Sequence, residues 1–255
     1  MFVIKLRFKK AAFICALLLV ISGCEPESET TYYRSGAKKE LKHIKSKQAH
    51  GPYIRYFRSG KIERKGQYFE GAEDGKWIYY FESGKERGRE VHVKGKKEGM
   101  SYRLNVHGGY QSKSNWANGK RDGSTTVWKK GKKSEEAIYV NGLKHGSLKR
   151  WNKDGRLSEE EEYKQGKRIR VRFWHASNGT LSSELKLKND KIQSAVSWHD
   201  NGEKHSDSIY VKDRVVEIKC WDDAGKVLGS KPSRELGLRC PYPGEKEKPK
   251  EGKTE

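Results

Sequence analysis

The sequence predicts an all-β fold, an elongated antiparallel sheet of about eight stacked β-hairpin repeats of 23–24 residues each. Aromatic residues and glycines recur in step at this interval, and no segment after the first 24 residues carries a sustained helical period. With 33% hydrophobic and 35% charged residues, the chain lacks material for one large core. Its 13 Tyr, 7 Trp and 7 Phe are nevertheless too many for a disordered chain.

The first element, residues 1–23, is predicted to be a lipoprotein signal peptide. An apolar run of 11 residues, Ala11 to Ile21, follows a basic segment that contains no acidic residue. The run has about half the length that a membrane-spanning helix needs, so we expect it to be cleaved off. The basic residues are Lys5, Arg7, Lys9 and Lys10.

The next element is the lipidated N-terminus and tether, residues 24–30. The sequence Ile21-Ser22-Gly23-Cys24 resembles the bacterial lipobox. This resemblance implies that Cys24 carries fatty acids such as palmitate and anchors the chain to the cell membrane or outer membrane, facing the periplasm or the exterior. The alternative is an ordinary secretory signal with an incidental cysteine.

Residues 31–228 are predicted to be the repeat array. Two ladders of mostly aromatic residues recur every 23–24 residues, and neighbouring units are expected to stack and bury these rows. The first ladder is Tyr32, Tyr56, Tyr80, Leu104, Trp128, Trp151, Trp174, Trp198 and Trp221. The second is Ile44, Tyr68, His92, Trp116, Tyr139, Tyr163, Leu187 and Tyr210.

Each repeat is predicted to be strand, turn, strand, turn. In one unit the aromatic run Gly75 to Phe81 precedes the turn around Gly84, and the alternating stretch Arg89 to Lys94 precedes Gly95. Glycine fits such turns because it adopts positive φ without steric cost. In the last units, Asp190 and Asp213 replace the glycine of the second turn.

The pattern Tyr68-x-x-Gly71-x-x-x-Gly75-x-Trp77-x-x-Tyr80-x-x-x-Gly84 resembles the MORN-repeat variant of bacterial proteins. The resemblance covers residues 31–228 and implies stacked β-hairpins used for binding, with no catalytic residue to carry over. Some proteins of that family are antitoxin components of toxin–antitoxin systems. The resemblance therefore also implies an alternative function, an antitoxin or immunity-type protein that neutralises a toxin by binding it.

The C-terminal elements are a cap, residues 229–240, and a tail, residues 241–255. After Cys15 and Cys24 are assigned to the signal and the anchor, Cys220 and Cys240 remain, and export favours a disulfide between them. Two unpaired thiols are the alternative, and a zinc site would lack ligands. The tail, rich in Pro, Lys and Glu, is expected to be disordered.

Catalytic and metal sites are not predicted, so we expect no enzyme activity and no cofactor. No nucleophile elbow, phosphate loop or paired metal-ligand motif is present. Four polar residues follow ladder tryptophans, but equivalent positions in adjacent repeats lie about 9.6 Å apart, too far to share one zinc ion. Acidic runs such as Glu159 to Glu162 predict cross-strand charge pairing. The four polar residues are Asn152, His175, His199 and Asp222.

The charge of the chain points to a binding partner. The formal net charge is +21, and cleavage of the signal with its four basic residues leaves +17. Outside the cytoplasm such a surface favours an envelope protein or an anionic envelope polymer, and export argues against nucleic acid. Tyr53 to Arg58 and Arg168 to Trp174 are candidate contact segments. The alternative is that lysine only keeps the exposed strands soluble.

Overall fold

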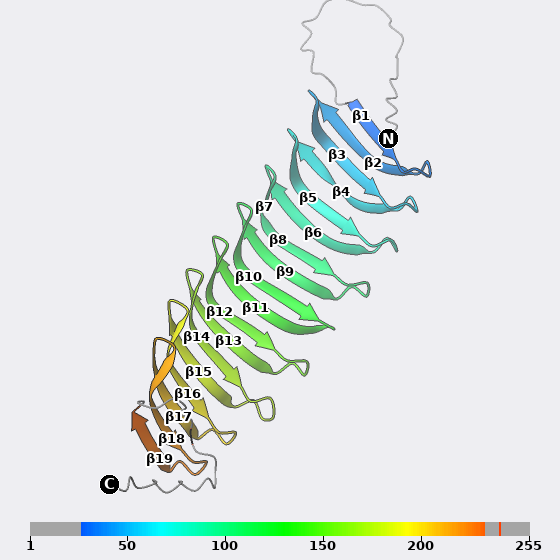
Figure 1. Cartoon of the computed structure of the whole chain (residues 1–255). Helices are drawn as coiled ribbons and strands as arrows, with labels where there is room; N and C mark the ends of the chain where they lie inside the picture. Colours follow the sequence, from blue (N-terminus) through cyan, green and yellow to red (C-terminus); the bar gives the residue numbers. More distant parts are fainter. Residues whose placement is uncertain (1–26, 233–239, 241–255) are drawn as a thin grey trace, which may run out of the picture. The chain divides into compact units, whose positions relative to one another are not determined.

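The structure is a computed structural model that describes residues 27–232 and residue 240. These residues form nineteen β-strands, paired antiparallel, which confirms the predicted all-β fold of hairpin repeats (Figure 1). Among them no helix is long and apolar enough to cross a membrane. The predicted signal peptide, Cys24 and the tail lie outside the described residues. The chain divides into two compact units, an N-terminal unit, Met1–Gly131, and a C-terminal unit, Lys132–Glu255.

The N-terminal unit is an antiparallel meander in which each strand pairs with the next along the chain. Strands β7 and β8 both pair with β6 and together form one interrupted strand. The strands are β1 (Glu27–Tyr32), β2 (Lys38–Lys45), β3 (Gln48–Tyr56), β4 (Ile62–Phe69), β5 (Ala72–Tyr80), β6 (Glu86–Val93), β7 (Lys96–Lys97), β8 (Gly99–Leu104), β9 (Tyr110–Ala117) and β10 (Lys120–Lys129).

The C-terminal unit repeats this arrangement with nine strands. Pairing continues into Val227–Pro232, which overlaps the segment that the sequence assigned to a cap. The strands are β11 (Lys132–Val140), β12 (Leu143–Trp151), β13 (Leu157–Lys164), β14 (Lys167–Trp174), β15 (Leu181–Lys188), β16 (Lys191–Trp198), β17 (Lys204–Val211), β18 (Arg214–Trp221) and β19 (Val227–Pro232).

Two kinds of turn alternate between the two edges of each unit (Figure 1). We call the turns that follow the second ladder the tip turns. They place two central residues at positive φ, for example Gln165 at 50° and Gly166 at 78°. This is the type I′ geometry that matches the twist of the flanking strands. Asp190 and Asp213 take the glycine position with φ of 60° and 63°, as aspartate tolerates.

The core of the C-terminal unit is one row of side chains that lie opposite each other on consecutive strands. We call it the central row. Leu148 is only 1% exposed, and Ala137 and Val171 are also buried. Removing this apolar surface from water stabilises the stacked strands. The central row is Ala137, Leu148, Glu161, Val171, Leu185, Ala195, Ser208 and Ile218.

The core of the N-terminal unit is an aromatic cluster. Trp77 is fully buried, and its ring lies 5.3 Å from the ring of Tyr53 and 5.2 Å from that of Tyr68. Gly66 makes room for the indole, because a Cβ at this position would meet the Trp77 ring at 2.4 Å. The guanidinium of Arg64 lies over the Tyr53 ring at 4.9 Å and adds a cation–π contact.

The ladder residues are not the most buried row. Trp151 and its equivalents, at the ends of their strands, are half-buried. Leu148 lies three residues before Trp151, as Trp77 lies before Tyr80, and is far more buried. The period is therefore as predicted, whereas the deepest burial falls three residues earlier than the first ladder.

Candidate binding surfaces

One row of side chains in the C-terminal unit alternates in charge across consecutive strands. Arg172 bridges two neighbours, with its Nε 2.7 Å from Glu184 and its Nη1 3.3 Å from Glu160. Lys149 lies 3.6 Å from the same Glu160. The pairing expected for Glu159 to Glu162 is therefore present, and this row neutralises itself. It runs Glu136, Lys149, Glu160, Arg172, Glu184, Val196, Asp207 and Lys219.

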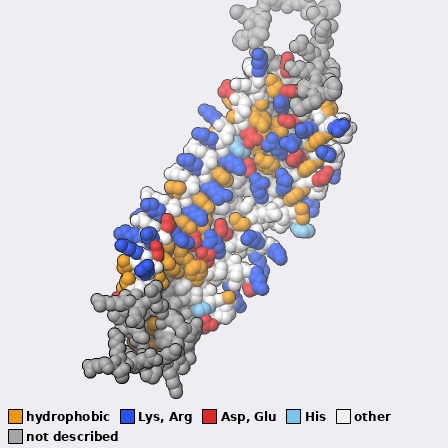
Figure 2. All heavy atoms as spheres, in the orientation of Figure 1, with side chains coloured by type: hydrophobic (Ala, Val, Ile, Leu, Met, Phe, Trp, Pro, Cys, Tyr) orange, Lys and Arg blue, Asp and Glu red, His pale blue; other side chains and the backbone are white. Residues whose placement is uncertain are grey.

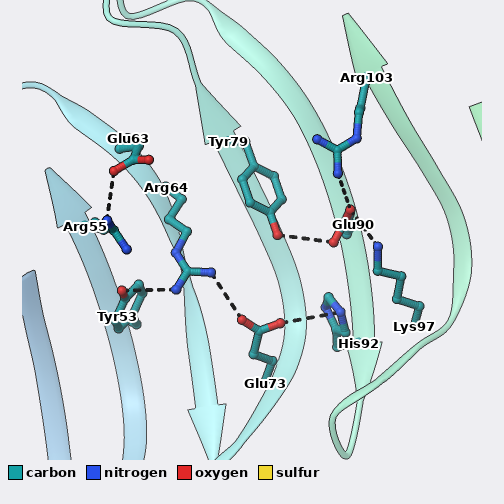
Figure 3. A network of polar contacts seen from close by, with 10 residues as sticks. All are labelled: Tyr53, Arg55, Glu63, Arg64, Glu73, Tyr79, Glu90, His92, Lys97 and Arg103. Carbon is teal, nitrogen blue, oxygen red and sulfur yellow. Dashed lines mark hydrogen bonds and ion pairs between the residues drawn. The ribbon is translucent and has the colours of Figure 1, made fainter. Parts of the chain in front are cut away.

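A buried carboxylate, Glu90, organises a polar network in the N-terminal unit (Figure 3). It accepts hydrogen bonds from Lys97 at 2.9 Å, from Tyr79 at 3.2 Å and from Arg103 at 3.4 Å. Burial alone would raise its pKa, but the hydrogen bonds from Lys97 and Tyr79 and the charges of Lys97 and Arg103 together lower it. Burial and the charge of Glu90 raise the pKa of Tyr79 to about 12.

Glu161 occupies the equivalent position of a repeat in the C-terminal unit. It accepts hydrogen bonds from the Tyr163 hydroxyl, from Arg168 at 3.2 Å and from Arg150 at 3.5 Å. Burial would raise its pKa, but the hydrogen bond from Tyr163 and the two arginines lower it. Because Glu90 and Glu161 are buried and fully partnered, both clusters serve the packing of the sheet.

The residues of the predicted contact segments that were expected to anchor a partner mostly have partners within the sheet. Tyr53 is only 2% exposed and packs against Trp77, so it offers no surface to a partner. Arg168 is engaged with Glu161, and Arg170 and Arg172 form ion pairs with Glu162 and Glu184. Phe173 alone is an exposed large apolar residue of the second segment. The binding contacts must therefore be sought elsewhere.

Three tip turns of the C-terminal unit carry exposed Lys and Arg side chains, and we call these three turns the lysine tips. Lys164 lies directly opposite Lys167 across one tip, and Lys188 lies directly opposite Lys191 across the next. No ion pair or side-chain hydrogen bond joins any of these four ammonium groups to the described residues. The six lysine-tip residues are Lys164, Lys167, Lys188, Lys191, Lys212 and Arg214.

This arrangement lowers the stability of the sheet. Like charges directly opposite each other on antiparallel strands are unfavourable, by a few tenths of a kcal/mol or more. Only two carboxylates, Asp190 and Asp213, lie in the same three turns, which leaves a local charge of +4. Figure 2 shows Lys and Arg spread over the visible face among fewer Asp and Glu. The lysine tips therefore retain charge that a partner can neutralise.

The other edge of the C-terminal unit carries the four polar residues that follow ladder tryptophans. Asn152 and Asp222 accept two backbone N–H groups each and close their own turns. His175 and His199 instead reach the next repeat, with Nε2 3.1 Å from the Trp198 and Trp221 carbonyls respectively. The structure therefore separates these residues into turn caps and links between repeats.

A hollow of about 480 Å³ opens beside the two histidines. His175 Nδ1 lies 2.8 Å from Asp200, and the His199 and His205 rings meet edge to face at 4.6 Å. Burial and the neighbouring His199 lower the pKa of His205. The lining residues are His175, Trp198, His199, Asp200, Asn201, His205 and Asp223. Within residues 27–232 and 240, no group of three or more His, Cys, Asp or Glu could hold a metal ion.

The remaining predicted site residues are the cysteines. The structure joins Cys220, on β18, to Cys240 through a disulfide that spans 20 residues of sequence. Bonding of this kind restricts the unfolded chain and ties Cys240 to the last repeats. Cys24, the predicted lipidation site, lies outside the described residues.

Sequence reasoning missed both the lysine tips and the hollow. The signal for the first was present, because Lys164 and Lys167 flank the two residues Gln165 and Gly166, and a two-residue turn places its flanking residues opposite each other. The hollow had no such signal. It depends on the conformation of turns whose residues each have another local role.

Comparisons with known proteins identify no family. No protein-family model matches the chain, and no curated protein matches it. Among solved structures, a mutant of S. aureus TarM in complex with Fondaparinux, alpha-GlcNAc-glycerol and UDP is similar at 18% identity and a TM-score of 0.29. A second TarM crystal structure has 18% identity and a TM-score of 0.28. Each match covers 42% of this chain, which spans 21% and 20% of those chains respectively. At these values neither likeness carries an argument about fold or function.

Proposed function

We propose that the chain is a lipid-anchored, non-enzymatic scaffold of the bacterial envelope that binds an anionic polymer through the lysine tips. The observation that carries this proposal is the pair of opposed lysines at two successive tips, Lys164 with Lys167 and Lys188 with Lys191. In the alternating row of the same unit, by contrast, charges are paired, as Arg172 is with Glu160 and Glu184. A polyanion would relieve the repulsion at the tips and gain from the exposed positive charge.

The spacing of the tips supports an extended partner. Successive tips on the same edge are two strands apart, which corresponds to about 9.6 Å. A polymer with closely spaced phosphates or carboxylates can meet each tip in turn, whereas a small anion can engage only one. Several weak contacts on one chain then add up to appreciable affinity through their high effective concentration.

The test is binding of inorganic polyphosphate to the purified full chain, measured by fluorescence anisotropy of the labelled polymer. Substituting Lys164, Lys167, Lys188 and Lys191 by Gln should lower the affinity at least tenfold. The matched control removes four exposed lysines of the same unit that lie away from the tips, namely Lys132, Lys153, Lys219 and Lys226.

Both variants lose four positive charges, so a difference in affinity between them reflects the positions of the lysines and not the net charge. The control should retain affinity within about threefold of the parent chain, because long-range attraction is screened beyond about 10 Å at moderate salt. Equal losses in the two variants would show that only the overall charge attracts the polymer. Absence of binding by the parent chain would reject the proposed function.

A further inference from the structure

We infer that the hollow at the histidine edge of the C-terminal unit is a binding site for a neutral polyhydroxylated ligand, a sugar. Its volume of about 480 Å³ lies within the range of about 300–1,000 Å³ that is typical of small-molecule sites. The inference is independent of the proposed function, because the hollow and the lysine tips share no residue.

The walls of the hollow are held in place by hydrogen bonds between repeats. His199 Nε2 lies 3.1 Å from the Trp221 carbonyl, which can only accept, so this nitrogen donates. Asn201 donates from Nδ2 to the Asp223 carbonyl at 2.7 Å and accepts from the Glu203 amide at 3.0 Å. Side chains fixed in this way bind without a large loss of conformational freedom.

Several polar atoms of the lining remain available. His199 uses Nε2 for the Trp221 carbonyl, and its Nδ1 has no hydrogen-bond partner among the described residues. Nε2 of His205 and the carboxylate of Asp223 also have no hydrogen-bond partner among the described residues. His205 uses only Nδ1, which lies 3.1 Å from the Ser197 hydroxyl.

The polar groups of the hollow suit a neutral ligand with several hydroxyl groups. His175 faces the Trp198 carbonyl with Nε2 and the Asp200 carboxylate with Nδ1, so Asp200 already has a partner within the protein. Asp223, the second lining carboxylate, has no such side-chain partner among the described residues. Sugar hydroxyls can donate to it and to His199, and can donate to or accept from His205, as a mixed donor and acceptor set requires.

Trp198 completes the set of groups that a sugar needs. It is half-buried and lines the hollow beside the polar groups. An aromatic side chain at this place can pack against the C–H face of a pyranose ring, and the surrounding polar side chains then fix the orientation of the hydroxyls. An aromatic residue and hydrogen-bonding groups thus line the same hollow.

The experiment is saturation-transfer NMR of the full chain with glucose, galactose, mannose, cellobiose and lactose, with choline as a cationic probe. We expect at least one sugar to bind and choline not to bind. Asp223→Asn, an exposed and structurally mild change, should weaken sugar binding at least tenfold. The matched control is Asp154→Asn, which alters an equivalent edge turn outside the hollow and should leave binding unchanged.

Three outcomes would overturn the inference. They are binding of choline without any sugar, no binding by any of the five sugars, and sugar binding that Asp223→Asn leaves unaffected. The lysine-tip variant should retain full sugar binding. Failure of polyphosphate binding would therefore reject the proposed function and leave the sugar site untouched. Failure of sugar binding would reject the sugar site and leave the proposed function untouched.

Discussion

Glu161 shows how a charged residue can occupy the central row between Leu148 and Val171. A carboxylate there is tolerated because Tyr163, Arg150 and Arg168 replace the water that it loses. The same solution appears at Glu90 with a different set of donors. Whether a charged residue can be buried in this core therefore depends on the hydrogen-bond donors around it.

The lowered pKa of Glu161 predicts a dependence of stability on pH. Its folded-state pKa lies below the unfolded value, near 4.3, so its contribution is present above that pH and is lost as pH falls through the lowered folded value. Glu161→Gln should reduce the free energy of unfolding at pH 7 by about 1–3 kcal/mol, since Arg168 loses its carboxylate partner while Arg150 keeps Glu135 and Glu159. The loss should shrink below pH 4 in urea titrations. An undiminished difference at pH 3 would contradict this account.

Leu148 provides a test of the position of the core. Leu148→Ala should lower the free energy of unfolding by about 2–5 kcal/mol, because it removes a fully buried side chain. The control is Leu143→Ala, at a residue 54% exposed, which should change stability by about 0.5 kcal/mol or less. Denaturant unfolding followed by circular dichroism measures both. Similar losses would mean that the central row is not the core.

At the scale of a single hairpin, the opposed lysines lower stability and favour polyphosphate binding. Lys191→Glu should stabilise the chain by about 0.2–1 kcal/mol, because an ion pair with Lys188 replaces a like-charge contact. The same change should weaken polyphosphate binding. The double variant Lys188→Glu, Lys191→Glu restores a like-charge pair beside Asp190, and should lose the gain in stability while binding weakens further. A destabilised single variant would contradict the proposed repulsion.

Hairpins are also the scale at which the sequence was most informative. The repeat length, the alternation of strand and turn and the positive φ at Gly166 follow from periodic glycines and ladder residues. The depth to which each side chain is buried does not follow from this periodicity. Leu148 and Trp151 are both apolar, and only the packing of side chains over the sheet shows that the first is covered and the second half-covered. The hollow likewise depends on the conformation of edge turns.

At the scale of the whole molecule, the proposed scaffold must be held at a membrane. Cys24→Ala should abolish incorporation of labelled fatty acid and release the processed chain from the membrane fraction, because the proposed anchor is the acyl group on Cys24. Radiolabelled palmitate and fractionation of cells measure the two effects. Retained label on the variant would reject Cys24 as the lipidation site.

The dependence of polyphosphate affinity on salt concentration tests the central claim most directly. Six lysine-tip cations predict a slope of log affinity against log salt of about −4, if polyphosphate follows the coefficient of about −0.7 per contact of single-stranded nucleic acids. Replacing Lys164, Lys167, Lys188 and Lys191 by Gln leaves two contacts and should reduce the slope to about −1.4. The four-lysine control should keep the parent slope. A slope that the tip substitutions leave unchanged would show that the polymer binds elsewhere and would contradict the account.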